Sequence, residues 1–175
     1  MIYMKENDNK IKISKTDKTK GYWLNQDFIS EDLKSKLEND NVLFVPEFWK
    51  DEKTIGFYEG VHPFYEFIEE QEIDNLKIGI CIEEEDYREL HLHADVLWMG
   101  MVIIECFVLP LFINLLSNYI DSHYFHDSDD KIDIKLNIQK KNEENILLEY
   151  HGGCDDFIKL INDDNFNELI KNPEE

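Results

Sequence analysis

The most regular hydrophobic pattern in the chain lies in its last third. Four isoleucine and leucine residues alternate with polar residues over 131–139, which is the two-residue period of a strand with one buried face. A second alternating run follows at 146–150, and the two runs predict an antiparallel hairpin. Gly152-Gly153 then turns the chain into a helix whose buried stripe begins at Phe157.

The preceding part of the chain predicts a strand, a helix and a second strand. Ser30 is suited to cap a short amphipathic helix, and the continuous apolar run Val42–Val45 after it is typical of a buried strand. Pro63 is suited to the first position of the next helix, and residues 76–82 form another apolar strand. Because both strands lie within about forty residues, we predict a right-handed parallel crossover between them.

The longest apolar stretch runs from Val96 to Leu116, with four interruptions at Gly100, Glu105, Pro110 and Asn114. We predict a buried helix over about 95–120, kinked at Pro110, preceded by a strand with one polar face over 89–94.

A stretch of this length could also cross a membrane, so a membrane anchor is one alternative. Two observations favour the buried helix. Glu105 would lie near the bilayer centre, where a carboxylate costs about 3 kcal/mol, and no Lys/Arg cluster flanks the stretch. A second alternative is a helix that is buried between subunits of a homo-oligomer.

Together these elements predict an α/β (or α+β) fold. We expect one globular domain over 1–175, with residues 1–10 and 172–175 flexible. Its core is a mixed sheet of about five strands with a long central apolar helix, and a C-terminal β-hairpin followed by a helix.

The charge of the chain limits its partners. Eighteen Lys and Arg residues stand against 39 Asp and Glu residues, which gives a formal net charge of -21. This charge repels nucleic acid and anionic membranes and attracts a basic protein partner. A plainer interpretation is that the charge only maintains solubility. The three cysteines are far apart and the first residues lack the apolar core of a secretory signal, so we expect a cytoplasmic protein.

Candidate catalytic and metal-binding groups are few. His91 and His93 lie on one face of a predicted strand, but two histidines are fewer than the ligands of a usual zinc site. A second pair, His123 and His126, would lie at the other end of the long helix, about 35–40 Å away. The acidic segment 126–130 lacks the spacing of a calcium loop. We therefore predict no metal and no cofactor.

Nucleophilic catalysis has one candidate pair, Cys154 and His151, which lacks an evident orienting group. Glu105 is the other unusual group, since a carboxylate within an apolar helix needs a donor or a proton. Neither forms a catalytic signature, and we identify no catalytic residue.

The remaining clue is a set of residues suited to an interface. Trp23, Trp49 and Tyr58 lie in polar or loop-like surroundings, where aromatic residues often anchor partners. Glu83, Glu84, Glu85 and Asp86 form a solvated acidic connection. Local packing is the plainer role of the aromatic residues.

The sequence therefore favours a small acidic protein-binding module. It would act as a regulatory, accessory or immunity-type subunit that holds a basic protein. One variant of this hypothesis is mimicry of a nucleic acid, in which the protein occupies a DNA-binding cleft. The first alternative is a small hydrolase or nucleotide-acting enzyme that uses His91, His93, Glu105 or the Cys154–His151 pair. The second is a membrane-associated or oligomerising subunit that uses residues 96–116.

Overall fold

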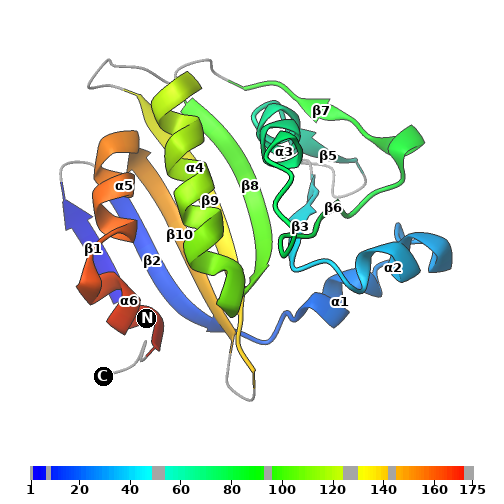
Figure 1. The fold of residues 1–175 in the computed structure, drawn as a ribbon, viewed down its shortest axis with the longest axis horizontal. Helices are drawn as coiled ribbons and strands as arrows, with labels where there is room; N and C mark the ends of the chain where they lie inside the picture. The colour runs from blue at the N-terminus through cyan, green and yellow to red at the C-terminus, as the bar shows by residue number, and fades with distance from the viewer. Residues whose placement is uncertain are drawn as a thin grey trace.

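The structure is a computed structural model that describes residues 2–6, 9–48, 54–92, 96–123, 130–141 and 145–171. Its main sheet has the strand order β1-β2-β10-β9-β8-β3-β6, and a small sheet has the order β4-β5-β7 (Figure 1). The strands are β1 (Ile2–Glu6), β2 (Asn9–Thr16), β3 (Val42–Val45), β4 (Glu47–Phe48), β5 (Ile55–Tyr58), β6 (Ile78–Ile80), β7 (Glu89–Leu90), β8 (Val96–Glu105), β9 (Lys131–Gln139) and β10 (Asn145–Gly153).

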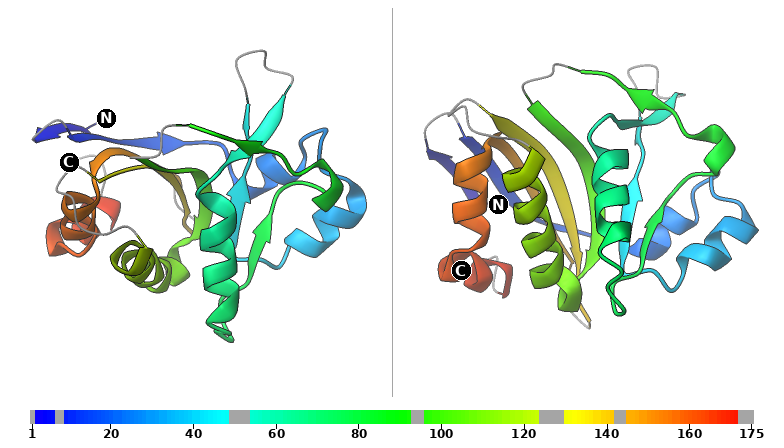
Figure 2. Two further views of the ribbon diagram at one scale, coloured as in Figure 1. Left: turned by 90° about the horizontal axis from the view of Figure 1, so that it is seen from above. Right: turned by 45° about the horizontal axis from the view of Figure 1, so that its top comes forward.

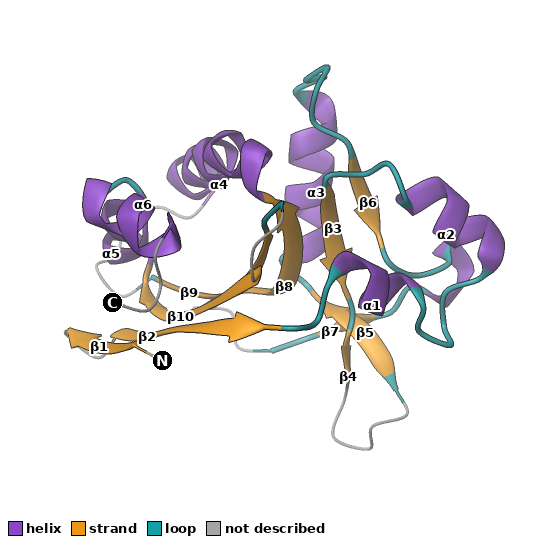
Figure 3. Cartoon of the chain, turned by 90° about the horizontal axis from the view of Figure 1, so that it is seen from below, coloured by secondary structure: helices purple, strands orange, loops and turns teal. Residues whose placement is uncertain are grey.

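Helices lie on both sides of the main sheet. They are α1 (Lys20–Leu24), α2 (Glu31–Leu37), α3 (Val61–Glu70), α4 (Leu109–His123), α5 (Cys154–Ile161) and α6 (Asp164–Lys171), with the 3₁₀ turns η1 (Glu84–Asp86) and η2 (Cys106–Val108). Helices α4, α5 and α6 lie on one side of strands β8, β9 and β10, as Figure 3 and the left view of Figure 2 show. The opposite side of β9, β10 and the first residues of β8 is called the open face below.

The pairing of the strands makes the sheet mixed. β3 runs parallel to β6 and β8 runs parallel to β9, whereas the other neighbours in the main sheet are antiparallel. The parallel β3–α3–β6 unit and the β9–β10 hairpin confirm the sequence predictions for these segments. The α/β fold with a long apolar helix and a C-terminal hairpin followed by a helix is also confirmed.

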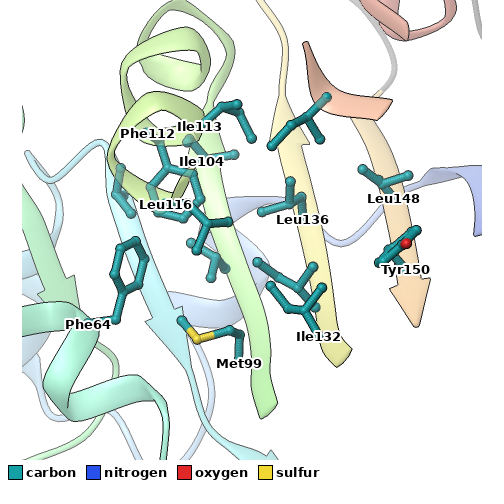
Figure 4. Close-up of a cluster of buried hydrophobic side chains, with 14 of the residues drawn as sticks. Phe64, Met99, Ile104, Phe112, Ile113, Leu116, Ile132, Leu136, Leu148 and Tyr150 are labelled. Carbon is teal, nitrogen blue, oxygen red and sulfur yellow. The ribbon is translucent and has the colours of Figure 1, made fainter. Parts of the chain in front are cut away.

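The larger hydrophobic core lies between the sheet and helices α3, α4 and α5 (Figure 4). Phe64 of α3 and Phe112 of α4 are fully buried, and their rings meet at a centroid distance of 5.7 Å. Leu136 and Leu148 face the same core from β9 and β10, as the period of two predicts. A second cluster covers the other face of β3 and β8 with α1 and α2, through side chains that include Trp23, Leu33, Leu37 and Leu43.

The predicted helix over 95–120 is only half right. Residues 109–123 form α4, but Val96–Glu105 is the central strand β8. The two clusters explain the error: Val102 and Ile104 belong to one core and Ile103 to the other, so the strand is buried on both faces. Such a strand lacks polar alternation and cannot be distinguished from a buried helix by periodicity. Pro110 consequently lies in the first turn of α4, where it causes no kink.

Smaller differences concern the ends of elements. Ser30 caps α2 as predicted and accepts a hydrogen bond from the Leu33 backbone N–H at 3.1 Å. Helix α3 begins two residues before Pro63. The strand expected over 89–94 is described only as β7, and residues 93–95 lie outside the described part of the chain. Within the N-terminal segment 1–10, which we expect to be flexible, Ile2–Glu6 form β1 and Asn9 begins β2. Residues 172–175 lie outside the described part of the chain.

None of the helices in the described ranges is both long and apolar enough to cross a membrane.

Candidate functional site: an acidic groove beside α2

A groove of about 430 Å³ lies where the segment before α2 meets β5 and the connection from β6 to β7. It is lined by Asp27, Phe28, Ser30, Thr54, Ile55, Ile82, Glu83, Asp86 and Arg88. Three segments that are far apart in the sequence therefore contribute to one surface.

Local structure fixes the acidic side of the groove. The Ser30 hydroxyl that caps α2 also donates to the Glu83 carboxylate, so the cap ties the two walls together. The η1 turn is closed by a hydrogen bond from the Asp86 backbone N–H to the Glu83 carbonyl at 2.9 Å. This turn leaves Glu84, Glu85 and Asp86 exposed beside the groove.

The floor of the groove is apolar. Ile82 is buried, whereas Phe28 and Ile55 are half-buried and present carbon to the groove. The Phe28 ring meets Phe48 edge-to-face at 6.1 Å between centroids, and Phe48 is 49% exposed. An exposed phenylalanine beside an apolar floor is suited to contact the aliphatic part of a ligand.

The charged groups of the lining are unequal in number. Three carboxylates, those of Asp27, Glu83 and Asp86, stand against the single guanidinium of Arg88. An apolar floor with a negative rim suits a lysine or arginine side chain, because its stem can rest on carbon while its head meets carboxylates.

The predicted binding residues are distributed over several places. Glu83 and Asp86 line the groove, and Glu84 and Glu85 lie next to it. Trp23 is only 7% exposed and packs in the cluster under α1 and α2. Tyr58 lies apart from the groove lining, at the end of β5, and Trp49 lies outside the described residues.

Sequence reasoning did not identify the other seven lining residues as binding residues: Asp27, Phe28, Ser30, Thr54, Ile55, Ile82 and Arg88. No pattern in the sequence indicated that the start of the predicted helix at Ser30 lies beside the acidic connection 83–86. Only the tertiary packing of α2 against the β6–β7 connection brings these residues together.

The groups that we considered for catalysis do not gather in one place. Cys154 is buried in the larger core, and burial together with the nearby Asp130 and Asp155 raises the pKa of its thiol to about 12. A thiolate nucleophile is therefore disfavoured at this position. His151 instead contacts Asp133, with 2.8 Å between Nδ1 and Oδ2.

The other histidines and Glu105 are also apart. His91 is exposed and lies 2.9 Å from Glu59, measured from Nδ1 to Oε2, while His93 and His126 lie outside the described residues. His123 stacks on Tyr119 at the end of α4. Within the described ranges, no three His, Cys, Asp or Glu side chains are placed to hold a metal ion.

Glu105 has a structural partner. It ends β8, and its Oε1 atom lies 3.8 Å from Lys20 Nζ. Lys20 also donates to the backbone carbonyl of Glu38 at 2.7 Å and to that of Asp40. The lysine thus joins α1 to the end of α2 and to β8.

Comparison with protein-family models, with curated proteins and with solved structures found no match to this chain.

Proposed function

We propose that this protein is an acidic protein-binding module that holds a basic segment of a protein partner in the groove beside α2. The observation that carries the proposal is the combination of an apolar floor with three rim carboxylates. The net charge of -21 supports it, because a strongly negative protein attracts a basic partner over a distance and speeds the encounter.

Binding at this groove has a specific chemical form. A lysine or arginine side chain of the partner lays its stem on Phe28 and Ile55, and its charged head meets the carboxylates of Glu83 and Asp86. Exposed Phe48 extends the apolar surface toward neighbouring residues of the partner. Arg88 opposes the binding of a cation and limits the affinity.

The test compares two sets of substitutions of equal charge. The groove set replaces Asp27, Glu83 and Asp86 by Asn, Gln and Asn, which keeps the shape of the side chains. The control set replaces Glu70, Asp121 and Glu168, which are exposed and absent from the lining, by Gln, Asn and Gln. Tagged protein of each type is used to capture partners from a lysate of its native cells at low and at high salt.

The expected result is a stoichiometric basic protein on the wild type and the control set, released by salt. The groove set should lose about 3- to 150-fold in affinity, since each of the three exposed charge contacts contributes about 0.2–1 kcal/mol. Arg88→Gln should strengthen binding, because it removes the one cation of the lining. Equal loss by both sets, weaker binding by Arg88→Gln, or the absence of a basic partner would each contradict the proposal.

A further inference from the structure

A second cluster of aromatic and charged side chains lies on the open face, away from the groove. Trp98, Asp133 and His151 are neighbours in register on β8, β9 and β10. The His151 ring lies 5.8 Å from the Trp98 ring between centroids, and its Nδ1 atom lies 2.8 Å from Asp133 Oδ2. All three side chains are half-buried, so part of each reaches the surface.

The small sheet forms a wall beside this row. Tyr58 at the end of β5 lies 5.6 Å from Trp98 between ring centroids, with the two planes tilted by 42°. Glu47 of β4 and Tyr58 both approach Gly100 of β8. A Cβ atom added to Gly100 would lie 3.2 Å from Glu47 Oε1 and 3.4 Å from Tyr58 Cδ2. The open face and the small sheet thus meet in a corner lined by two aromatic rings and two carboxylates.

The backbone of β8 makes this close approach possible. Its register with β9 shifts between Trp98 and Gly100, and Gly100 has φ +64°, a left-handed conformation that glycine adopts without strain. The glycine has no Cβ atom to push Glu47 and Tyr58 away. Bulges that redirect side chains in this way are over-represented next to binding and active sites.

The electrostatics of the corner favour a cation. Burial raises the pKa of the Tyr58 hydroxyl, and the charges of Glu47 and Asp133 raise it further, so both carboxylates act at the ring. Lys10 lies opposite His151 in the β2–β10 register, on the side of β10 away from Trp98, and Lys131 and Lys135 lie two residues before and after Asp133 on β9. Aromatic faces carry a negative quadrupole and attract cations, most strongly where carboxylates add to the field.

The kind of cation follows from the two aromatic rings of the corner. Asp133 Oδ2 already contacts His151, and the carboxylates of Asp133 and Glu47 both contribute negative charge beside the Tyr58 ring. A primary ammonium group is strongly hydrated and needs acceptors, whereas an alkylated ammonium group needs only apolar faces and negative charge. We propose that the corner formed by Trp98, Tyr58, Glu47 and Asp133 binds the quaternary ammonium group of a small organic cation. This proposal is independent of the groove.

The test uses choline as the probe and its neutral carbon analogue, 3,3-dimethylbutan-1-ol, as the control ligand. Binding is followed by the indole N–H signal of Trp98 in ¹H–¹⁵N spectra. This signal is assigned by its absence from the spectrum of Trp98→Phe. Choline should shift this signal saturably at millimolar concentrations, and the neutral analogue should leave it unchanged. Equal responses to both ligands, or no saturable response to choline, would overturn the proposal.

Matched variants separate the corner from the rest of the open face. Glu47→Gln and Asp133→Asn should each weaken choline binding severalfold, because each removes one carboxylate charge. Glu149→Gln is the control: Glu149 lies two residues from His151 on the same strand and pairs with Lys12 at 3.4 Å. An equal loss of choline binding in Glu149→Gln would show general charge attraction and contradict a site at the corner. Folding of each variant is checked by its unchanged spectrum elsewhere.

Discussion

Replacing Gly100 by alanine tests whether β8 depends on its left-handed residue. Alanine at φ +64° costs about 1–2 kcal/mol relative to glycine, because its Cβ atom meets the following carbonyl. The new atom would also lie 3.2 Å from Glu47 Oε1, so the β4 side chain must move by a few tenths of an ångström. The smaller entropy of the unfolded chain returns about 0.5 kcal/mol. We expect a net loss of about 0.5–1.5 kcal/mol in the free energy of unfolding.

The matched control is Gly21→Ala. Gly21 lies in α1, is exposed, and an added Cβ atom would meet only Thr19 Oγ1 at 3.6 Å. This substitution should stabilise the protein by about 0.5 kcal/mol, since alanine is a better helix former and restricts the unfolded chain.

Both variants are measured by urea unfolding, followed by tryptophan fluorescence and by circular dichroism. A change of 1 kcal/mol corresponds to about 2–4 °C in Tm at this chain length, so thermal unfolding gives a second readout. If Gly100→Ala is as stable as the wild type while Gly21→Ala behaves as expected, the left-handed bulge and the close approach of the small sheet are refuted. Gly100→Ala should also weaken choline binding at the corner.

Two further predictions concern titratable groups. Among the three cysteines, Cys106 is exposed, whereas burial raises the pKa of both Cys81 and Cys154 to about 12. A thiol reagent at neutral pH should therefore modify one thiol in the folded protein and three after denaturation. Rapid modification of Cys154 in the folded state would contradict its burial. Burial also raises the pKa of Asp40, although Lys20 and Lys77 oppose the shift. A raised carboxyl pKa means that the folded state binds the proton more tightly, so ionisation costs stability as pH rises through and above the ordinary value of 3.8. Asp40→Asn should therefore stabilise the protein at pH 7 relative to the wild type and lose this advantage at acidic pH, as measured by urea unfolding across that range; an advantage that grows on acidification would contradict the direction of the shift.

Local patterns in the sequence were sufficient for the elements whose two faces differ. The hairpin at 131–150 was predictable because its inner residues pack under α4 and α5 while its outer residues remain polar or half-exposed. Helix α2 was predictable because Ser30 supplies the cap and Leu33 and Leu37 supply the buried stripe. In each case the hydrophobic period records a single buried face.

The strand β8 and both binding surfaces depended on tertiary structure. β8 is buried on both faces, so its sequence carries no period from which its secondary structure can be deduced. The acidic residues 83–86 stood out in the sequence as charge alone. Their apolar floor comes from Phe28 and Ile55, and only packing places these side chains beneath the acids. Similarly, His151 had no visible orienting partner, because Asp133 lies on a neighbouring strand and the sheet register alone brings the two together. Sequence determines which side chains are available at short range, whereas a site assembled from separate elements is determined by the contacts between them.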